Sequence, residues 1–374
     1  MTRRERVLKA INHEEPDRVP IDLGAHFSTG ISAFAYQNLR EYLGLPVNDI
    51  EVPDYSQMLA RVDEDVLERF NCDCILLNSP WANPKRWNPR GRYSFLMPDK
   101  MNLTQNEAGD WIASNDNKQM RMPTGGFFFD GEWLNISDYD GFEDMIKKTA
   151  PRAEHIYKET DYFTMLMTFS AFFHGLDHAC DMYTDPEDVV AAQKELLTNQ
   201  LQGARLVIDH LGKYIQCIAI NADLGMQDGP MISPDMFEKF CYPYLKELCS
   251  FIHNNSDLKI FIHTCGAIEP LLQMLIDAGI DIINPVQISA KGMDPALLKQ
   301  KYGKNLCFWG GGCNTQTVLG TGSVEDVRQN VKELVDIFKP GGGFVFNQVH
   351  NVMGNVPVEN IVAMLDTAFE VGGY

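Results

Sequence analysis

Short apolar segments alternate with amphipathic segments along most of the chain. Each apolar segment has the length of one β-strand and lacks a polar face, as expected for a strand that is buried on both sides in a parallel sheet. Such segments occupy residues 19–23, 74–78, 164–169, 217–221, 259–264, 280–287, 305–311 and 343–349. Because helical patterns separate them, the sequence predicts an α/β fold of the (β/α)8 TIM barrel type.

The helical segments carry start signals. Ser233 and Asp185 each precede a proline, so each is expected to be the N-cap of a helix that begins at that proline. Ser323 is followed three residues later by Asp326, a pattern close to a capping box. The glycines at 341–343 follow a helical pattern and lead into a strand, which indicates a helix-to-strand turn and not a phosphate-binding loop.

Residues 80–139 interrupt this alternation. They contain no long helical pattern, and they are rich in turn-forming residues and aromatics. We expect an insertion of β-hairpins at the C-terminal end of the barrel, within one domain that spans residues 1–374. The aromatics can form a small core of the insertion, or they can line a substrate pocket. They are Trp81, Trp87, Tyr93, Phe95, Trp111, Phe127, Phe128, Phe129 and Trp133.

Composition and charge exclude several classes of function. The chain has 32 Lys and Arg against 51 Asp and Glu, a net charge of −19. This balance argues against general binding to nucleic acids or to anionic membranes. The N-terminal segment has charges but no apolar stretch, and no apolar run is long enough to span a membrane. We therefore expect a cytoplasmic protein, whose nine cysteines are reduced.

Two potential metal ligands follow the fifth predicted strand. His263 and Cys265 are two residues apart. In extended backbone, residues at this spacing point to the same side, so an imidazole and a thiolate can reach one ion. This donor pair suits zinc better than magnesium or calcium. Further ligands would come from other strands, with His350, Cys313 and Asp223 as candidates.

Other polar residues are predicted at the same rim of the barrel. We expect Asp223, Gln227 and Asn284 to act in catalysis and Gln287, His174 and Gln348 to contact substrate. The alternative is a hydrogen-bond network that supports the metal ligands, and for His174 a structural role beside His178. The remaining cysteines of apolar segments are expected in the core, namely Cys72, Cys74, Cys217, Cys241, Cys249 and Cys307.

Four segments, residues 3–20, 222–248, 263–303 and 308–361, resemble the uroporphyrinogen decarboxylase superfamily. Within it the chain is most similar to the cobalamin-dependent methyltransferases. The resemblance implies a (β/α)8 barrel. Methyltransferases of this branch bind zinc through the His and Cys of the H-x-C triplet and a later Cys ahead of a P-x-E-N segment. Here P-x-E-N is residues 357–360, and His350 stands at the matching distance. The resemblance therefore implies the ligands His263, Cys265 and His350, with Cys313 as the alternative third ligand.

Two differences between this chain and the family pattern determine which function we expect. The decarboxylases resemble enzymes that hold a polycarboxylate through arginines after the first strand, yet no Arg or Lys lies between Val19 and Leu39. An imidazole in place of a thiolate makes a zinc site one charge more positive and a stronger Lewis acid, which suits cleavage of a methyl ether. We favour methyl transfer between a small O-methylated molecule, aryl methyl ethers included, and a corrinoid cobalt. The alternatives are methylation of a thiol by a methylcorrinoid, porphyrinogen decarboxylation and a non-catalytic barrel.

The cobalamin must come from a partner. The chain lacks the D-x-H-x-x-G segment through which cobalamin-binding domains supply a histidine to cobalt. We expect a separate corrinoid protein to cover the barrel mouth, attracted by the acidic charge of this chain if its own rim is basic. The sequence leaves the substrate, the direction of transfer and the oligomeric state, a homodimer included, open.

Overall fold

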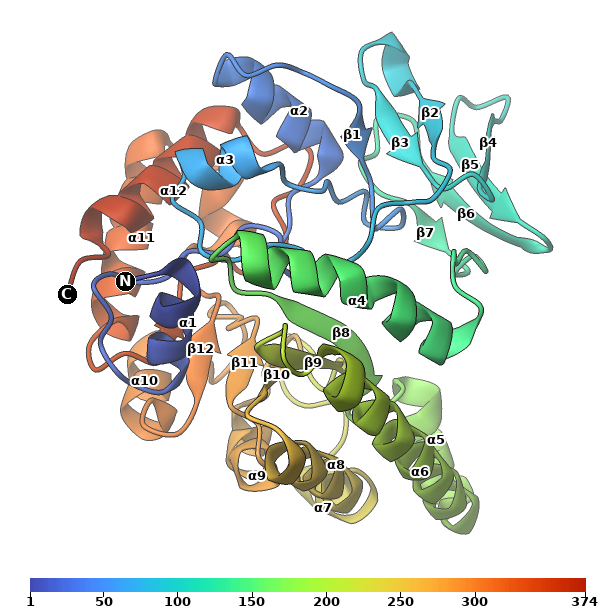
Figure 1. Cartoon of the computed structure of the whole chain (residues 1–374), viewed down its shortest axis with the longest axis vertical. Helices are drawn as coiled ribbons and strands as arrows, with labels where there is room; N and C mark the ends of the chain where they lie inside the picture. Colours follow the sequence, from blue (N-terminus) through green and yellow to red (C-terminus); the bar gives the residue numbers. More distant parts are fainter.

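The structure, a computed structural model, describes residues 1–374 and contains a six-stranded parallel sheet at its centre. Strands that are neighbours in the sheet are also neighbours along the chain, as in a barrel (Figure 1). Six of the predicted strands are thereby confirmed. Their bounds are β8 Met165–Ser170, β9 Cys217–Asn221, β10 Lys259–His263, β11 Ile282–Asn284, β12 Cys307–Trp309 and β13 Phe344–Val345.

The first two predicted strands are reduced to single bridges. Ile21 bridges to Phe346 beyond β13, and Cys74 bridges to Phe163 ahead of β8, both in parallel. The backbone N–H of Asp73 donates to the Ile21 carbonyl at 2.7 Å, so hydrogen bonds run from β13 through both segments to β8. Long ladders do not form here, because the Asp73 carboxylate takes the Ile21 N–H at 2.8 Å. The prediction of full strands at 19–23 and 74–78 is corrected accordingly.

The interior of this ring is a separate hydrophobic cluster. It contains 14 buried residues, and on β9, β12 and their neighbours they come from alternate positions of the strands. Helix α1 (Arg3–Ile11) contributes Val7, Ala10 and Ile11 to the same cluster. Since these residues pack with the early residues of the strands, such as Cys217 and Cys307, α1 closes the amino end of the ring. The carboxyl end is left for loops and polar side chains.

Helices surround the ring, and most of them pack against a neighbouring helix (Figure 1). The contact between α12 and α2 joins the last part of the chain to the first. None of the helices is both long and apolar enough to cross a lipid bilayer. The longer helices are α2 Ala33–Tyr42, α4 Gly141–Glu159, α6 Pro186–Leu211, α8 Tyr242–Asn255, α11 Val324–Phe338 and α12 Val358–Val371. The shorter ones are α3 Glu64–Arg69, α5 Leu176–Thr184, α7 Pro234–Phe240, α9 Leu272–Ala278 and α10 Pro295–Tyr302, with single turns at Pro89–Gly91, Glu269–Leu271 and Thr315–Leu319.

All three predicted N-cap positions are confirmed, and two of them make the side-chain bond. The Ser233 side chain accepts the N–H of Met236 at the start of α7, and Ser323 forms a complete capping box with Asp326 at the start of α11. Asp185 is the N-cap of α6, which begins at Pro186, but its side chain makes no capping bond. Its carboxylate instead accepts a hydrogen bond from the Thr184 hydroxyl at 2.7 Å.

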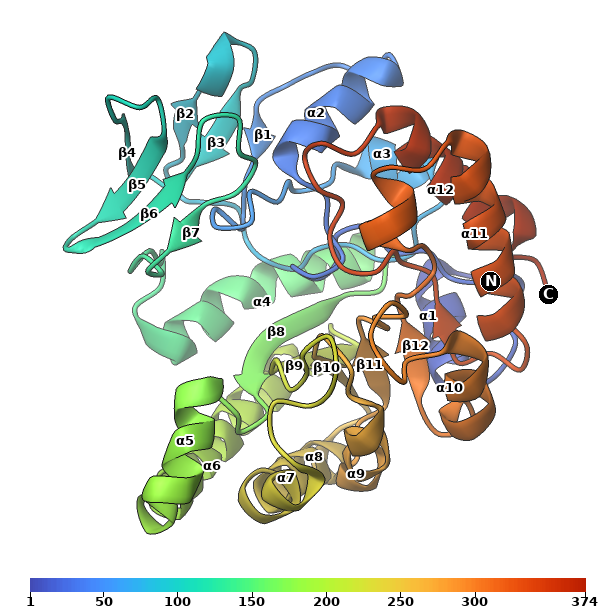
Figure 2. The same ribbon diagram turned by 180° about the vertical axis from the view of Figure 1, so that it is seen from behind.

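The interrupting segment forms antiparallel hairpins, as predicted. One hairpin joins β2 (Lys85–Trp87) to β3 (Phe95–Met97), and β3 also pairs with β1 (Ile50–Glu51) from outside the segment. The second sheet contains β4 Asn102–Gln105, β5 Trp111–Asn115, β6 Lys118–Met122 and β7 Asp130–Gly131. Figure 2 shows these sheets next to α2, at the opposite end of the molecule from α7 to α9.

Candidate metal centre

Polar side chains form the layer of the ring interior that lies at the carboxyl ends of the strands. Phe261 on β10 lies in the interior cluster, and His263, two residues later, therefore points to the same side. His263 is in register with Asn221 at the end of β9 and with Asn284 at the end of β11. The layer above the apolar interior thus consists of one imidazole between two amides.

Three potential ligands converge at this layer. One ligand atom each from His263, Cys265 and His350 lies within 4.8 Å of the others. The Sγ atom of Cys265 is 3.7 Å from Nε2 of His263, and the two imidazole centroids are 5.7 Å apart. All three residues are partly exposed, so the group is open to the barrel mouth. The structure therefore brings together the three residues that the sequence nominated as metal ligands.

Asn284 fixes the orientation of the His263 ring. Its side-chain N–H donates to the Trp309 carbonyl at 2.9 Å, so its Oδ1 must face His263, 3.0 Å from Nδ1. An amide oxygen only accepts, so Nδ1 carries the proton and Nε2 keeps its lone pair free. The Ser28 hydroxyl donates to the same oxygen at 2.6 Å. Buried Asn284 thus presents Nε2 of His263 toward Cys265, as a residue behind a metal ligand does.

A tight contact between two loops holds Cys265 in place. The backbone of Gly266 has φ +91°, and a Cβ there would lie 2.4 Å from the carbonyl carbon of Gly225. Only glycine is compatible with both features. The adjacent Ala267 N–H donates to the Met226 carbonyl at 2.8 Å. The loop after β10 is thus packed directly on the loop after β9.

His350 is placed by a strained backbone between two anchored residues. It has φ +64°, which is uncommon for a residue other than glycine. The Val349 N–H donates to the Cys313 carbonyl at 3.0 Å. On the other side, the Asn351 carboxamide oxygen accepts the Gly30 N–H at 2.7 Å. Strain of this kind persists where the surrounding structure enforces it, and it is frequent at functional sites.

Burial determines the protonation of the three side chains. It lowers the pKa of His350 to about 4, with the neighbouring His263 as the second cause, and it lowers the pKa of His263 as well. Burial raises the pKa of Cys265 to about 12, and the Asp223 carboxylate adds to this effect. At neutral pH the site holds two neutral imidazoles and a thiol. A bound cation would displace the proton of the Cys265 thiol, and it would compensate the negative charge of the thiolate that forms.

Asp223 lies at the edge of the triad formed by His263, Cys265 and His350. Its Oδ1 is 3.8 Å from Nε2 of His263 and accepts the Cys265 N–H at 3.4 Å. Its side chain is largely exposed to the barrel mouth. Asp223 is therefore the one carboxylate that is close enough to interact with both a ligand and a molecule bound in the mouth.

Three other predicted residues are used in loop-to-loop hydrogen bonds. Gln287 accepts the Gly266 N–H at 2.8 Å and donates to Gln227 at 3.1 Å. Gln227 in turn donates to the Ser289 carbonyl at 2.6 Å. Gln348 is buried and donates to carbonyls of the loop after Ile21. The structure thus places all three where they connect the loops that carry the triad.

His174 and Cys313 lie outside the triad. His174 is exposed on the loop before α5, where its ring lies 5.2 Å from that of His178. Cys313 is fully buried, and it is not among the residues whose ligand atoms converge. The geometry therefore favours His350 over Cys313 as the third ligand. The six cysteines predicted in the core are all buried.

His26 is a neighbour of the site that the sequence analysis missed. Its ring lies 5.7 Å from the His263 ring, and Nδ1 is 2.7 Å from the Ser28 hydroxyl. Its Nε2 is buried without a hydrogen-bond partner. Burial, with His263 and His350 nearby, lowers the pKa of His26 well below its usual value. Its position just after the first predicted strand was a signal that could have identified it.

The comparison with protein families agrees with this architecture. Residues 177–371, more than half of the chain, match the family model described as uroporphyrinogen decarboxylase (URO-D). The fold defines the class of protein, which is an α/β barrel with the candidate site at its carboxyl end. The chain belongs to the uroporphyrinogen decarboxylase family. A comparison with curated proteins finds no significant match.

Two solved structures are similar to the chain, and the first of them supports the fold. A methyltransferase from Methanosarcina mazei is similar with a TM-score of 0.60 and 15% sequence identity, and the similarity covers 99% of both chains. A mutant β-glucosidase derived from a hyperthermophilic tetrameric structure gives a TM-score of 0.43 at 12% identity, over 96% of this chain and 98% of the other. The first similarity extends the shared fold over the whole length of the chain, hairpins included.

Proposed function

We propose that this protein is a zinc-dependent methyltransferase that moves a methyl group between a small O-methylated molecule and the cobalt of a corrinoid protein. The observation that carries the proposal is the convergence of one thiol and two imidazoles at the mouth of the barrel. The full-length similarity to a methyltransferase fold is consistent with it.

The donor set fits zinc. Two nitrogens and one sulfur within 4.8 Å of one another match the three-ligand pattern of catalytic zinc sites, which keep a fourth position open. His263 offers a free Nε2 lone pair because Asn284 holds its other nitrogen. Zinc bound by His263, Cys265 and His350 would supply Lewis acidity toward an oxygen of the methyl donor.

The charge of the donor set favours an ether over a thiol. One thiolate with two neutral imidazoles leaves a net positive site, whereas strongly donating thiolates would be needed to keep a bound thiol nucleophilic. Asp223 is then available to orient the donor or to accept a hydrogen bond from it, since its carboxylate faces the mouth. His263 and His350 stay neutral and hold their positions, while Asn284 and the Gly225–Gly266 contact keep them and Cys265 in place.

Exposed apolar side chains around the mouth support a protein partner. Leu176, Met226 and Met353 are all exposed; Leu176 begins α5 after β8, and the two methionines lie on the loops that follow β9 and β13. Apolar side chains that surround an opening in this way are typical of a surface that another protein covers. We propose that the corrinoid protein covers it, since the transferring methyl group must reach cobalt directly.

Porphyrinogen decarboxylation is the second candidate, because the family match itself favours it. In that reaction Asp223 would stabilise the pyrrole nitrogens, and no metal would be required. The absence of Arg and Lys from residues 20–38 weighs against it, since carboxylate side chains of the substrate would lack cationic partners there.

One experiment separates these functions. The zinc content of the purified protein is measured, and the zinc-loaded protein is mixed with cob(I)alamin and a series of O-methyl and S-methyl donors. Formation of methylcobalamin from O-methyl donors, followed by absorbance and abolished by chelation of zinc, is the expected result. Release of CO2 from uroporphyrinogen by metal-free protein, without methyl transfer, would instead establish the decarboxylase.

A further inference from the structure

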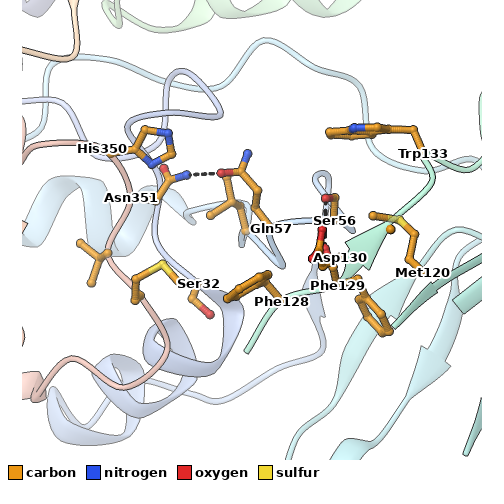
Figure 3. Close-up of a pocket in the computed structure, with 14 residues that line it drawn as sticks. Ser32, Ser56, Gln57, Met120, Phe128, Phe129, Asp130, Trp133, His350 and Asn351 are labelled. Atoms are coloured by element: carbon orange, nitrogen blue, oxygen red, sulfur yellow. Dashed lines mark hydrogen bonds between the residues drawn. The ribbon is translucent and has the colours of Figure 1, made fainter. Parts of the chain in front are cut away.

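A cavity of about 370 Å³ lies between His350 of the proposed metal site and the hairpin segment. Asn351 and Met353 line one side of it with His350, and residues 128–131 and Trp133 line the other. Figure 3 shows His350 and Trp133 on opposite sides of this space, with Phe128 between them. Cavities of roughly 300 Å³ and above hold small ligands, and one of about 150 Å³ already accepts benzene. The volume is therefore sufficient for a single substituted aromatic ring.

The aromatics of the hairpin segment fall into two groups. Trp87 contacts Phe95, Trp111 and Phe129 at centroid distances of 5.1 to 6.1 Å; Trp111 is partly buried and the other three rings are buried. This group forms the core of the segment, which is one of the two roles that the sequence allowed for these aromatics. Phe128 and Trp133 differ, because they line the cavity with 47% and 63% of their surfaces exposed. Large aromatic side chains that remain exposed beside a cavity are suited to contact with a flat apolar ligand.

The charge of the cavity limits its ligand further. None of the 14 lining residues is Lys or Arg. The lining does include Asp130, an exposed carboxylate that makes no ion pair, because Arg121, which stands opposite it on β6, is paired with Asp110. A carboxylate on the ligand would be repelled by Asp130 and would find no cationic side chain in the lining.

From these observations we infer that the cavity binds a neutral aromatic methyl ether of one ring, with Phe128 and Trp133 as specificity-determining residues and Asp130 as a barrier to anionic rings. That the ligand is a methyl ether rests on the proposed function. That it is a neutral aromatic ring rests on the cavity alone. A ring held there lies next to His350, so a methoxy group on it can extend toward the triad.

The test measures binding to zinc-free protein by calorimetry, so that it does not depend on turnover. The probes are 2-methoxyphenol and 4-hydroxy-3-methoxybenzoate, which carry the same methoxyphenol unit but differ by one carboxylate. We expect the neutral probe to bind about tenfold more tightly at neutral pH. Trp133→Ala should weaken its binding about tenfold, while Tyr183→Ala, which removes an exposed aromatic on α5, should leave it unchanged.

Asp130→Asn provides the second arm. It should bring the affinities of the two probes to within about threefold of each other, because the repulsion is removed while the aromatic contacts remain. Absence of binding of 2-methoxyphenol, or binding that Trp133→Ala leaves intact, would overturn the inference. In that case methyl transfer from an aliphatic ether would show that the proposed function stands without it. Tight binding of 2-methoxyphenol with no methyl transfer from any donor would show that the inference about the cavity stands and that the proposed function fails.

Discussion

The two parts of the chain build the ring in different ways. From β8 onward, every strand pairs with its successor in a parallel ladder, with one bulge in β8 between Met167 and Phe169, and each strand is followed by a helix. Before β8, the ring is completed by single bridges at Ile21 and Cys74, and the hairpins of residues 80–139 replace a regular element. The family match begins at residue 177 and therefore lies within the regular part.

This difference separates two tasks of the site. All three proposed metal ligands lie in the regular part, at the ends of β10 and after β13, where the ladder and its loops fix them. The irregular part supplies Phe128, Trp133 and Asp130 to the neighbouring cavity. The proposed metal ligands and one wall of the cavity are thus carried by separate segments of the chain, and on barrel folds such loop segments can differ while the strand ends keep their places.

The largest effect is expected in the regular part. Cys265→Ala removes one of three protein ligands and the only negative donor, so zinc affinity should fall by more than about a thousandfold and methyl transfer should be lost with it. Metal analysis after dialysis against a chelator measures this. Cys180→Ala, which changes an exposed cysteine away from the triad, is the matched control. Equal zinc content in both variants would contradict the assignment of Cys265.

The same division explains what the sequence could predict. The strands from β8 onward have uninterrupted apolar patterns, and the H-x-C spacing follows from strand geometry, so both could be inferred from local sequence. The support of His263 by Asn284 depends on the register of two strands, and the role of His26 depends on closure of the ring. Asp185 holds the predicted N-cap position, but its capping bond could not be foreseen to be missing, because the neighbouring Thr184 competes for its carboxylate. Which aromatics face the cavity depends on how the hairpins pack, and alternation along the chain does not encode it.

A second prediction distinguishes the two groups of aromatics within the irregular part. Trp87→Ala creates a cavity among Phe95, Trp111 and Phe129, so the free energy of unfolding should fall by about 3 to 5 kcal/mol. Trp133→Ala removes a mostly exposed ring and should cost less than about 1 kcal/mol. Urea unfolding, with hydrogen exchange of β5 and β6 as a local probe, compares them. Similar losses for both variants would show that Trp133 belongs to the core.

A third prediction concerns Asp22, beside the bridge at Ile21. Its buried carboxylate accepts hydrogen bonds from Trp309 Nε1 and the Ala25 N–H, and burial raises its pKa from 3.8 to about 6. Between these pH values the folded protein binds more protons than the unfolded chain, so stability is lost as the pH rises from 4 to 6, by about 3 kcal/mol. Asp22→Asn cannot titrate. Unfolding free energies of the wild type and variant should therefore diverge over this range, whereas parallel curves would contradict the prediction.

The smallest expected effect tests the helix starts of the regular part. Ser323→Ala removes a complete capping box from α11, whose first N–H groups then lose their side-chain acceptor, and this should lower the free energy of unfolding by about 1 kcal/mol. Asp185→Ala at α6 should cost less than about 0.5 kcal/mol, because its carboxylate binds the Thr184 hydroxyl and caps no backbone N–H. Thermal unfolding of the two variants provides the comparison. A larger loss for Asp185→Ala than for Ser323→Ala would mean that the Asp185 side chain caps a backbone N–H of α6 in solution, in addition to the N-cap position that it holds before Pro186.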